Sequence, residues 1–312
     1  MKTRKLTRPP AERVARKLRG ITRKEARESY GELTELATTC KKAPDFSRAG
    51  LKLLDYFFLK HRLRAKTRRG ISFYNALGNA ELLDYLNGKI RKIRSGIKVD
   101  EHLQQRYSMF QLYYGSINQF RPSEALKVYC ALKPRVGILD FSAGWGGRCL
   151  AAMAANIPYI GIDANTKMEP SYKKLVDEVH TITGTKPSVK MIFNPSETVD
   201  FSKYDYDLIF TSPPYFMIEK YEGMPGYVGK EAFLQEFLRP VVMGAWGGLR
   251  RGGHMALNMP EEMYDAVVPM LPALYKKMEL PVSNRHPVNA AVGREIKHEG
   301  QRHEYIYIWR KK

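Results

Sequence analysis

The sequence predicts an α/β fold with a mainly parallel sheet, preceded by a basic and mainly helical N-terminal region. After Pro122, short apolar runs typical of strands alternate with longer segments that have the apolar spacing of helices. This alternation favours βαβ units, in which helices connect parallel strands. A glycine-rich turn follows the first of these strands and a proline-containing polar loop follows the fourth. Both features therefore belong to the carboxyl edge of the sheet, where α/β proteins bind ligands.

The expected elements follow from these periodicities. Strands are expected at Val136–Phe141, Tyr159–Asp163, Val189–Phe193, Leu208–Phe210, His254–Asn258 and Tyr305–Trp309, with a closing hairpin from Pro281 onward. Helices are expected at Gly50–Arg64, Ala80–Ile93, Ser123–Leu132, Gly147–Ala155, Glu169–Thr181, Lys230–Trp246 and Met263–Lys277. The chain is accordingly divided into a basic, flexible extension (1–45), a basic helical region (46–114) and an α/β domain (115–312).

The positive charge is concentrated at the N-terminal end of the chain. Of 312 residues 44% are hydrophobic, which supports a substantial core, and the net charge is +20. Residues 1–70 contain 21 Lys or Arg against 7 Asp or Glu, so they hold +14 of that charge. A basic end on a nearly balanced body indicates a polyanionic partner, with nucleic acid foremost. A solvated tail that serves solubility is the alternative.

Cysteine content and hydropathy exclude several classes of protein. The three cysteines, Cys40, Cys130 and Cys149, are widely spaced and show no zinc-ligand pattern. Their odd number argues against a disulfide framework and favours a reducing compartment. No apolar run approaches the roughly 18 residues that a membrane span needs. No metal, no membrane association and a cytoplasmic location, in a bacterium or in the host of a phage or virus, are therefore expected.

The glycine-rich turn predicts a nucleotide-like ligand. Residues 140–147 read Asp-Phe-Ser-Ala-Gly-Trp-Gly-Gly, between a strand and a helix, and the glycines allow close approach of backbone to a ligand. Asp163 ends the next strand, where a carboxylate can accept both hydroxyls of a ribose; a helix N-cap is the alternative. Asn194 and Ser196 follow the third strand and can meet an adenine edge, or simply form a polar turn.

The loop after Leu208–Phe210 suits recognition of an exocyclic amine. It reads Thr211-Ser212-Pro213-Pro214-Tyr215, and its prolines fix φ and donate no backbone hydrogen bond. Hydroxyl and carbonyl oxygens can then accept the N–H groups of an amine while Tyr215 stacks on the base that carries it. Phe216 is a second stacking candidate or a core residue. A plain turn with Tyr215 buried is the alternative to the whole interpretation.

Together these motifs resemble those of amino-methylating DNA methyltransferases. Residues 140–147 resemble the S-adenosylmethionine (SAM) loop of class I methyltransferases, and 211–215 the catalytic motif of the enzymes that make N4-methylcytosine or N6-methyladenine. The Ser-Pro-Pro-Tyr form is commoner among the cytosine-N4 enzymes. Residues 118–122, Asn-Gln-Phe-Arg-Pro, resemble the segment that lies over the SAM methionyl group. The resemblance covers about residues 115–312 and leaves 1–114 unmatched.

The resemblance implies a Rossmann-like class I methyltransferase with a seven-stranded, mainly parallel sheet and SAM as cofactor. The implied activity is methylation of the exocyclic amine of a flipped base in duplex DNA, cytosine N4 first and adenine N6 second. An amine of an RNA base, a protein glutamine amide and a non-enzymatic nucleic-acid-binding protein are the remaining alternatives. A homodimer is left open.

The residues expected at each function are these. Catalysis is assigned to Ser212, Pro213, Pro214 and Tyr215; cofactor binding to Phe120, Asp140, Ser142, Ala143, Gly144, Gly146, Asp163, Asn194 and Ser196; and nucleic-acid binding to Arg62, Arg64, Lys66, Arg68, Arg69 and Phe216. Because no recognition domain is inserted between the two motifs, residues 46–114 are the candidate DNA-recognition element, and the loop from Glu219 to Gly229 is the second candidate.

Overall fold

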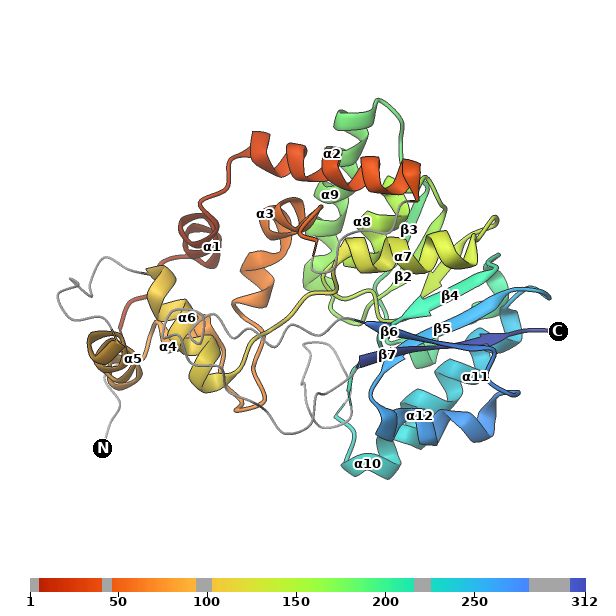
Figure 1. Ribbon diagram of the computed structural model, residues 1–312. Helices are drawn as coiled ribbons and strands as arrows, with labels where there is room; N and C mark the ends of the chain where they lie inside the picture. Colours follow the sequence, from red (N-terminus) through yellow and green to blue (C-terminus); the bar gives the residue numbers. More distant parts are fainter. Residues whose placement is uncertain (1–5, 41–46, 94–102, 216–225, 281–303) are drawn as a thin grey trace.

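A seven-stranded sheet forms the centre of the molecule (Figure 1). The computed structural model describes residues 6–40, 47–93, 103–215, 226–280 and 304–312. The strand order is β3-β2-β1-β4-β5-β7-β6. Neighbouring strands from β3 to β5 pair in parallel, whereas β7 runs antiparallel to both β5 and β6. The predicted α/β fold with a mainly parallel, seven-stranded sheet is confirmed.

The strands are short, and all of them except the antiparallel β7 end at the same, carboxyl edge of the sheet. They are β1 (Ile138–Asp140), β2 (Tyr159–Ile162), β3 (Val189–Ile192), β4 (Leu208–Thr211), β5 (His254–Met259), β6 (Lys276–Leu280) and β7 (Glu304–Arg310). Asp140 lies opposite Gly161, and Leu139 opposite Ile209. This register brings the turn after β1 and the loops after β2 and β4 to one edge.

Helices cover both faces of the sheet, because alternate strand residues point into two separate apolar cores. Ile138 and Leu208 contribute to one core, Leu139 and Ile209 to the other. The first core is covered by α7 (Pro122–Leu132), α8 (Gly147–Ala154) and α9 (Glu169–Thr183). The second is covered by a π-helical turn (Phe233–Leu238), α11 (Arg239–Gly248) and α12 (Glu261–Val267). The short α10 (Gly229–Ala232) precedes the π-helical turn and buries no residue. In the described part of the chain, no helix combines the length and apolarity needed to cross a membrane.

The C-terminal helix prediction was wrong in its extent. The helical stretch expected to reach Lys277 ends with α12 at Val267 and one 3-10 turn, and Lys276 begins strand β6 instead. Pro269 and Pro272 explain the early end, since proline lacks the N–H that a helix interior needs. The hairpin expected from Pro281 thus begins earlier, at β6, and its residues 281–303 lie outside the described part.

The N-terminal helices are integrated into the fold. They are α1 (Ala11–Arg19), α2 (Arg23–Thr39), α3 (Leu51–Arg62), α4 (Phe73–Ala76), α5 (Ala80–Ile93) and α6 (Leu103–Tyr114). Helices α2 and α3 bury side chains in the same core as α7 and α8, whereas α1, α4, α5 and α6 share a smaller core to which α3 also contributes Leu59. The prediction of a flexible extension is therefore wrong for residues 6–40, which are helical and contribute Tyr30 and Leu33 to the main core.

Polar contacts reinforce the attachment of α2. Glu178 of α9 accepts hydrogen bonds from Arg23 and Arg27, with Arg27 Nε 2.6 Å from its Oε1. The pKa of Glu178 is lowered, first by its hydrogen bond to Arg23. At the start of α2, Thr22 and Glu25 form a capping box that satisfies the free backbone N–H groups.

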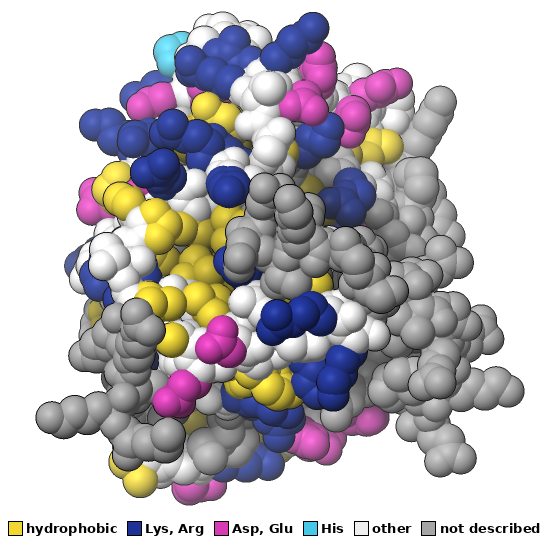
Figure 2. Space-filling view, turned by 90° about the vertical axis from the view of Figure 1, so that its left-hand side faces the viewer, with side chains coloured by type: hydrophobic (Ala, Val, Ile, Leu, Met, Phe, Trp, Pro, Cys, Tyr) yellow, Lys and Arg dark blue, Asp and Glu magenta, His cyan; other side chains and the backbone are white. Residues whose placement is uncertain are grey.

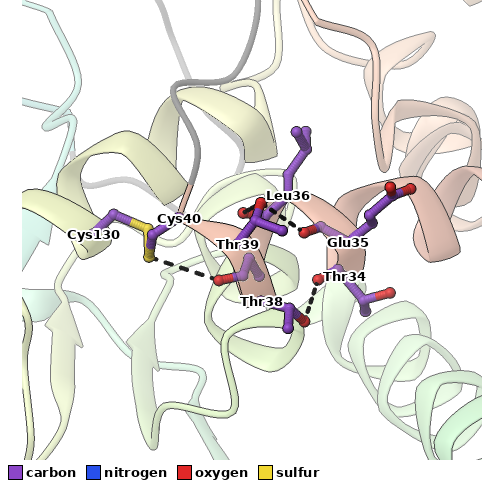
Figure 3. The surroundings of a disulfide bond; sticks show 8 residues. Thr34, Glu35, Leu36, Thr38, Thr39, Cys40 and Cys130 are labelled. Carbon is purple, nitrogen blue, oxygen red and sulfur yellow. Dashed lines mark hydrogen bonds between the residues drawn. A yellow bond between two sulfur atoms is a disulfide. The ribbon is translucent and has the colours of Figure 1, made fainter.

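A disulfide bond between Cys40 and Cys130 joins the end of α2 to α7 (Figure 3). Their Cα atoms are 5.6 Å apart, and 90 residues separate them in sequence. The expectation of no disulfide, drawn from the odd cysteine count, was wrong for this pair, and the inference of a reducing compartment loses its basis. Cys149 is free and buried, and burial raises the pKa of its thiol.

Removing this disulfide should destabilise the protein. Cross-linking a loop of this length lowers the entropy of the unfolded chain by the equivalent of about 4 kcal/mol. Cys130→Ser should therefore lower the free energy of unfolding by roughly that amount in urea titrations. Cys40→Ser and the double variant should lose the same amount of unfolding free energy and no more. An excess of reductant should lower the stability of the wild type to that of the variants. Three reactive thiols in the unreduced, denatured protein would contradict the pairing.

Candidate active site

A cavity of about 260 Å³ lies at the carboxyl edge of the sheet and is lined by both sequence motifs. Its walls come from the turn after β1, the loops after β2, β3 and β4, and the segment that precedes α7. Most of the predicted cofactor and catalytic residues line it: Phe120, Ser142, Ala143, Gly144, Asp163, Ser196, Ser212, Pro213, Pro214 and Tyr215. Residues that are about 70 positions apart in the chain thus share one chamber.

Three predicted cofactor residues do not line the cavity. Asp140 is fully buried behind the turn, where its carboxylate bonds to protein groups. Gly146 caps the start of α8 with φ +80°, and Asn194 is exposed. Asp140 and Gly146 therefore shape the turn, whereas Asn194 takes no part in the cavity. Phe216 lies outside the described residues.

Arg148 holds Asp140 in the protein interior. Arg148 Nε lies 2.7 Å from Asp140 Oδ2, and the side chains are 4% and 0% exposed. Tyr159 of β2 donates to the same carboxylate at 2.6 Å, and the Ser142 N–H donates at 3.2 Å. Burial alone lowers the pKa of Arg148, but the charge and hydrogen bonds of Asp140 outweigh it and raise that pKa. The pair is charged and fully bonded, as a buried ion pair must be to persist.

Besides Gly146, two further glycines of the turn are needed, for different reasons. Gly144 has φ +60°, a conformation that disfavours side chains. At Gly147, a Cβ atom would lie 2.0 Å from the carbonyl oxygen of Phe120, so no side chain fits. Because Gly147 has no side chain, the segment Asn118–Phe120, called the strap below, lies directly against the N-terminus of α8. The ring of Phe120 then lies 5.2 Å from the guanidinium of Arg148 and 5.5 Å from the ring of Phe210.

Asp163 faces the cavity and is not a helix N-cap, because Asn165 caps the 3-10 turn that follows. Its Oδ2 accepts the N–H of Gly144 at 2.8 Å and its Oδ1 that of Asn165 at 2.9 Å, while the residue still faces the cavity. Burial raises the pKa of its carboxyl group to about 6, although these two hydrogen bonds oppose the shift. Ionised Asp163 is thus a strong acceptor held in place by backbone.

The loop after β4 places Ser212 and Tyr215 on the opposite wall. Thr211 and Pro213 are buried, whereas Ser212 and Tyr215 are partly exposed to the cavity. The hydroxyl of Tyr215 donates to Asn258 Oδ1 at 3.3 Å, and Asn258 Nδ2 donates to the Tyr305 carbonyl at 3.2 Å. Strands β5 and β7 therefore fix the orientation of the Tyr215 ring.

Several lining residues were not predicted from the sequence: Trp145, Arg148, Asn165, Met168, Tyr227, Phe237 and Asn258. Asn258 carried a usable signal, since it is a polar residue near the carboxyl end of an apolar strand. Tyr227 did not, because it reaches the cavity from a distant loop, where its hydroxyl donates to Glu197 Oε1 at 2.6 Å.

Of the five predicted nucleic-acid residues that the structure describes, one is partly buried and four are exposed. Arg62 is 10% exposed and pairs with Asp55 on its own helix, so its assignment to nucleic acid was wrong. Arg64, Lys66, Arg68 and Arg69 are exposed in the turns after α3. Figure 2 views the side of the molecule that lies to the left in Figure 1, where many Lys and Arg side chains reach the surface around a stretch of apolar side chains.

Aromatic rings lie among these exposed cations. The guanidinium of Arg64 is 5.3 Å from the ring of Tyr74, and that of Arg69 is 5.8 Å from the ring of Tyr114. Tyr114 ends α6, four residues before the strap. Among the residues that the structure describes, no group of three or more His, Cys, Asp or Glu is placed to hold a metal ion.

Solved structures with a similar course of the chain are methyltransferases and related proteins. TrmN from Thermus thermophilus is 14% identical, with a TM-score of 0.42 over 74% of this chain and 79% of that one. A SAM-dependent methyltransferase from Agrobacterium tumefaciens is 17% identical, with a TM-score of 0.43 over 64% of this chain and 65% of that one. The 16S rRNA methyltransferase RsmC of T. thermophilus, solved with AdoMet and guanosine, is 16% identical, with a TM-score of 0.40 over 64% of this chain and 45% of that one.

No protein-family model and no curated protein matches the sequence. At these identities and TM-scores, the structural likeness bears on neither ligand nor substrate.

Proposed function

We propose that the protein is a SAM-dependent methyltransferase that acts on the exocyclic amine of a nucleic-acid base, with cytosine N4 in DNA as the preferred target. One observation carries the proposal: the glycine-rich turn with Asp163 and the Ser-Pro-Pro-Tyr loop line a single cavity. A nucleoside-type cofactor and an amine substrate can therefore meet within it.

The cavity offers suitable groups for each part of SAM. The ionised carboxylate of Asp163 is an acceptor for ribose hydroxyls, and its hydrogen bonds to backbone hold it in position. Ser196, Glu197 and Pro195 supply polar and apolar surface for an adenine ring. The strap and the turn after β1 would hold the methionyl part. When bound, SAM supplies a methyl group on a sulfonium sulfur.

The loop after β4 provides acceptors for the amine and a ring for the base. The lone pair of an exocyclic amine is delocalised into the base, which makes the nitrogen a weak nucleophile. Ser212 Oγ and the carbonyl of Pro213 can accept its two N–H groups and so favour a localised lone pair, where positive charge develops. Tyr215, held by Asn258, presents its ring for stacking. A base in a duplex would have to leave the stack to reach this wall.

The exposed cations after α3 support a nucleic-acid substrate. Arg64, Lys66, Arg68 and Arg69 are exposed, and Arg13, Arg16 and Lys17 line the outer side of α1. From Tyr114 to Asn118 the chain spans at most about 14 Å. Arg69, which lies beside Tyr114, is therefore close along the chain to the strap that borders the cavity.

Methyl transfer from labelled SAM to DNA, RNA and protein, followed by nucleoside analysis, tests the activity. Label in N4-methylcytosine of DNA is the expected result. If the label appears in N6-methyladenine, or in a base of RNA, the preferred target is wrong but methylation of an exocyclic amine still holds. Binding of SAM with no transfer to any acceptor amine would overturn the proposal.

Substitutions in the loop after β4 should separate chemistry from cofactor binding. Ser212→Ala should lower turnover by about 100-fold, the usual cost of removing one stabilising hydrogen bond from a transition state. Tyr215→Ala should lower it strongly and Tyr215→Phe weakly, because stacking needs the ring and not the hydroxyl. Calorimetry should show that each of these variants binds SAM with an affinity within twofold of wild type.

Tyr275→Ala, which removes an exposed ring, serves as the control and should keep wild-type turnover. Wild-type turnover in Ser212→Ala would exclude the mechanism.

SAM binding should depend on pH through Asp163. Its raised pKa of about 6 means that the carboxylate is mostly ionised at pH 7.5 and mostly protonated at pH 5, so the dissociation constant of SAM should rise by up to about tenfold between them. The empty protein should gain stability from this group over the same fall in pH, because the folded state binds the proton more tightly than the unfolded state. Asp163→Asn should bind weakly and without this pH dependence. A titration that is equally steep in that variant would remove Asp163 from the ribose site.

Nucleic-acid affinity should depend on salt through the cations after α3. Each phosphate contact contributes a log–log slope of about −0.9 on duplex DNA. Replacing Arg64, Lys66, Arg68 and Arg69 with Ala should flatten the slope in fluorescence anisotropy, with SAM affinity unchanged. A control with the same loss of charge replaces exposed lysines elsewhere, namely Lys186, Lys190, Lys203 and Lys276. Equal slopes for both variants would place the nucleic acid on another surface.

A further inference from the structure

Helix α3 carries an ion pair that connects the N-terminal helices to the wall of the cavity. Asp55 and Arg62 lie seven residues apart, two turns along one face of the helix, and their side chains are 25% and 10% exposed. Asp55 Oδ1 accepts hydrogen bonds from Arg62 Nη2 and, at 3.0 Å, from Gln119 Nε2. Gln119 belongs to the strap and lines the cavity.

This contact determines how the amide of Gln119 is oriented. A carboxylate only accepts hydrogen bonds, so the amide must turn its NH₂ group to Asp55 and its oxygen away. That oxygen, Oε1, is buried and has no hydrogen-bond partner among the described residues. A buried acceptor without a partner is costly, and the arrangement persists because Asp55 and Arg62 fix the other end of the amide.

The strap is thereby held at two points. Phe120 is held by contact with Gly147, Phe210 and the Arg148 guanidinium, all within the α/β domain. Gln119 is held by Asp55, which lies outside the part of the chain that resembles methyltransferases. Arg62 holds Asp55 in position, since its guanidinium donates a hydrogen bond to the same oxygen.

We propose that Asp55 is a positioning residue for the cofactor cavity: braced by Arg62, it holds the strap in its binding conformation, so that the N-terminal helices are required for SAM affinity. This inference rests on the proposed function. Asp55 acts through Gln119 and takes no part in methyl transfer. Helix α3 and the residues after it then have two roles. The inner face of α3 supports the cofactor cavity, and the residues that follow the helix carry the exposed cations.

Calorimetric titration of the full-length protein with SAM tests the proposal. Asp55→Ala removes a charge-assisted hydrogen bond to the strap and should raise the SAM dissociation constant by about tenfold or more. Its affinity for duplex DNA should stay within twofold of wild type. Lys60→Ala is the matched control, since it removes another ion pair of α3, that with Glu12 at 3.6 Å, without touching the cavity; its SAM affinity should be unchanged.

An exchange of the two groups separates positioning from general packing. Gln119→Glu alone places two carboxylates together and should weaken SAM binding, as should Asp55→Asn alone. The double variant D55N/Q119E restores the amide–carboxylate bond with its members exchanged, beside the same Arg62, and should recover most of the affinity. Additive losses in the double variant, or wild-type affinity in Asp55→Ala, would overturn the inference. Absence of SAM binding by the wild type would instead refute the proposed function.

Discussion

The buried pair of Arg148 and Asp140 is the interaction on which the cavity depends. Asp140 ends β1, and its carboxylate gathers bonds from α8, from β2 through Tyr159 and from the turn through Ser142. Arg148 in turn places its guanidinium against the ring of Phe120. This one fully desolvated pair thus determines how β1, the turn after it, α8 and the strap are arranged around the cavity. Removing either partner would leave an isolated buried charge, which typically costs 3–5 kcal/mol.

The parallel sheet explains why distant motifs converge. Parallel strands end at the same edge, so any polar residue that directly follows β1, β2 or β4 is brought there without a specific contact to guide it. Asp163 and Ser212 were found from the sequence for this reason: each lies next to the end of an apolar run. Their placement needed only the strand pattern and the direction of the chain.

Residues that the sequence analysis misplaced depend on partners that spacing does not reveal. Asp140 has the position of a ligand-binding acid, but an arginine eight residues later neutralises it, and the turn between them is long enough to fold back. Arg62 belongs to a run of basic residues, yet its helical phase turns it inward to Asp55, while the four cations that follow stay exposed. The pairing of Cys40 with Cys130 likewise depends on how α2 packs against α7. Contacts of this kind come from tertiary packing, which a linear pattern records only indirectly.

The N-terminal region is joined to the part of the fold that contains the cavity in three ways. Helices α2 and α3 bury apolar side chains in the core that also contains α7 and α8, the end of α2 is covalently tied to α7 through Cys40, and α3 contacts the strap through Asp55. The exposed cations after α3 begin two residues beyond Arg62, so the exposed charge and the contact with the strap lie within one short stretch of the chain. Under the proposed function, this stretch both supports the cofactor cavity and carries the phosphate contacts that bring a base toward Ser212 and Tyr215.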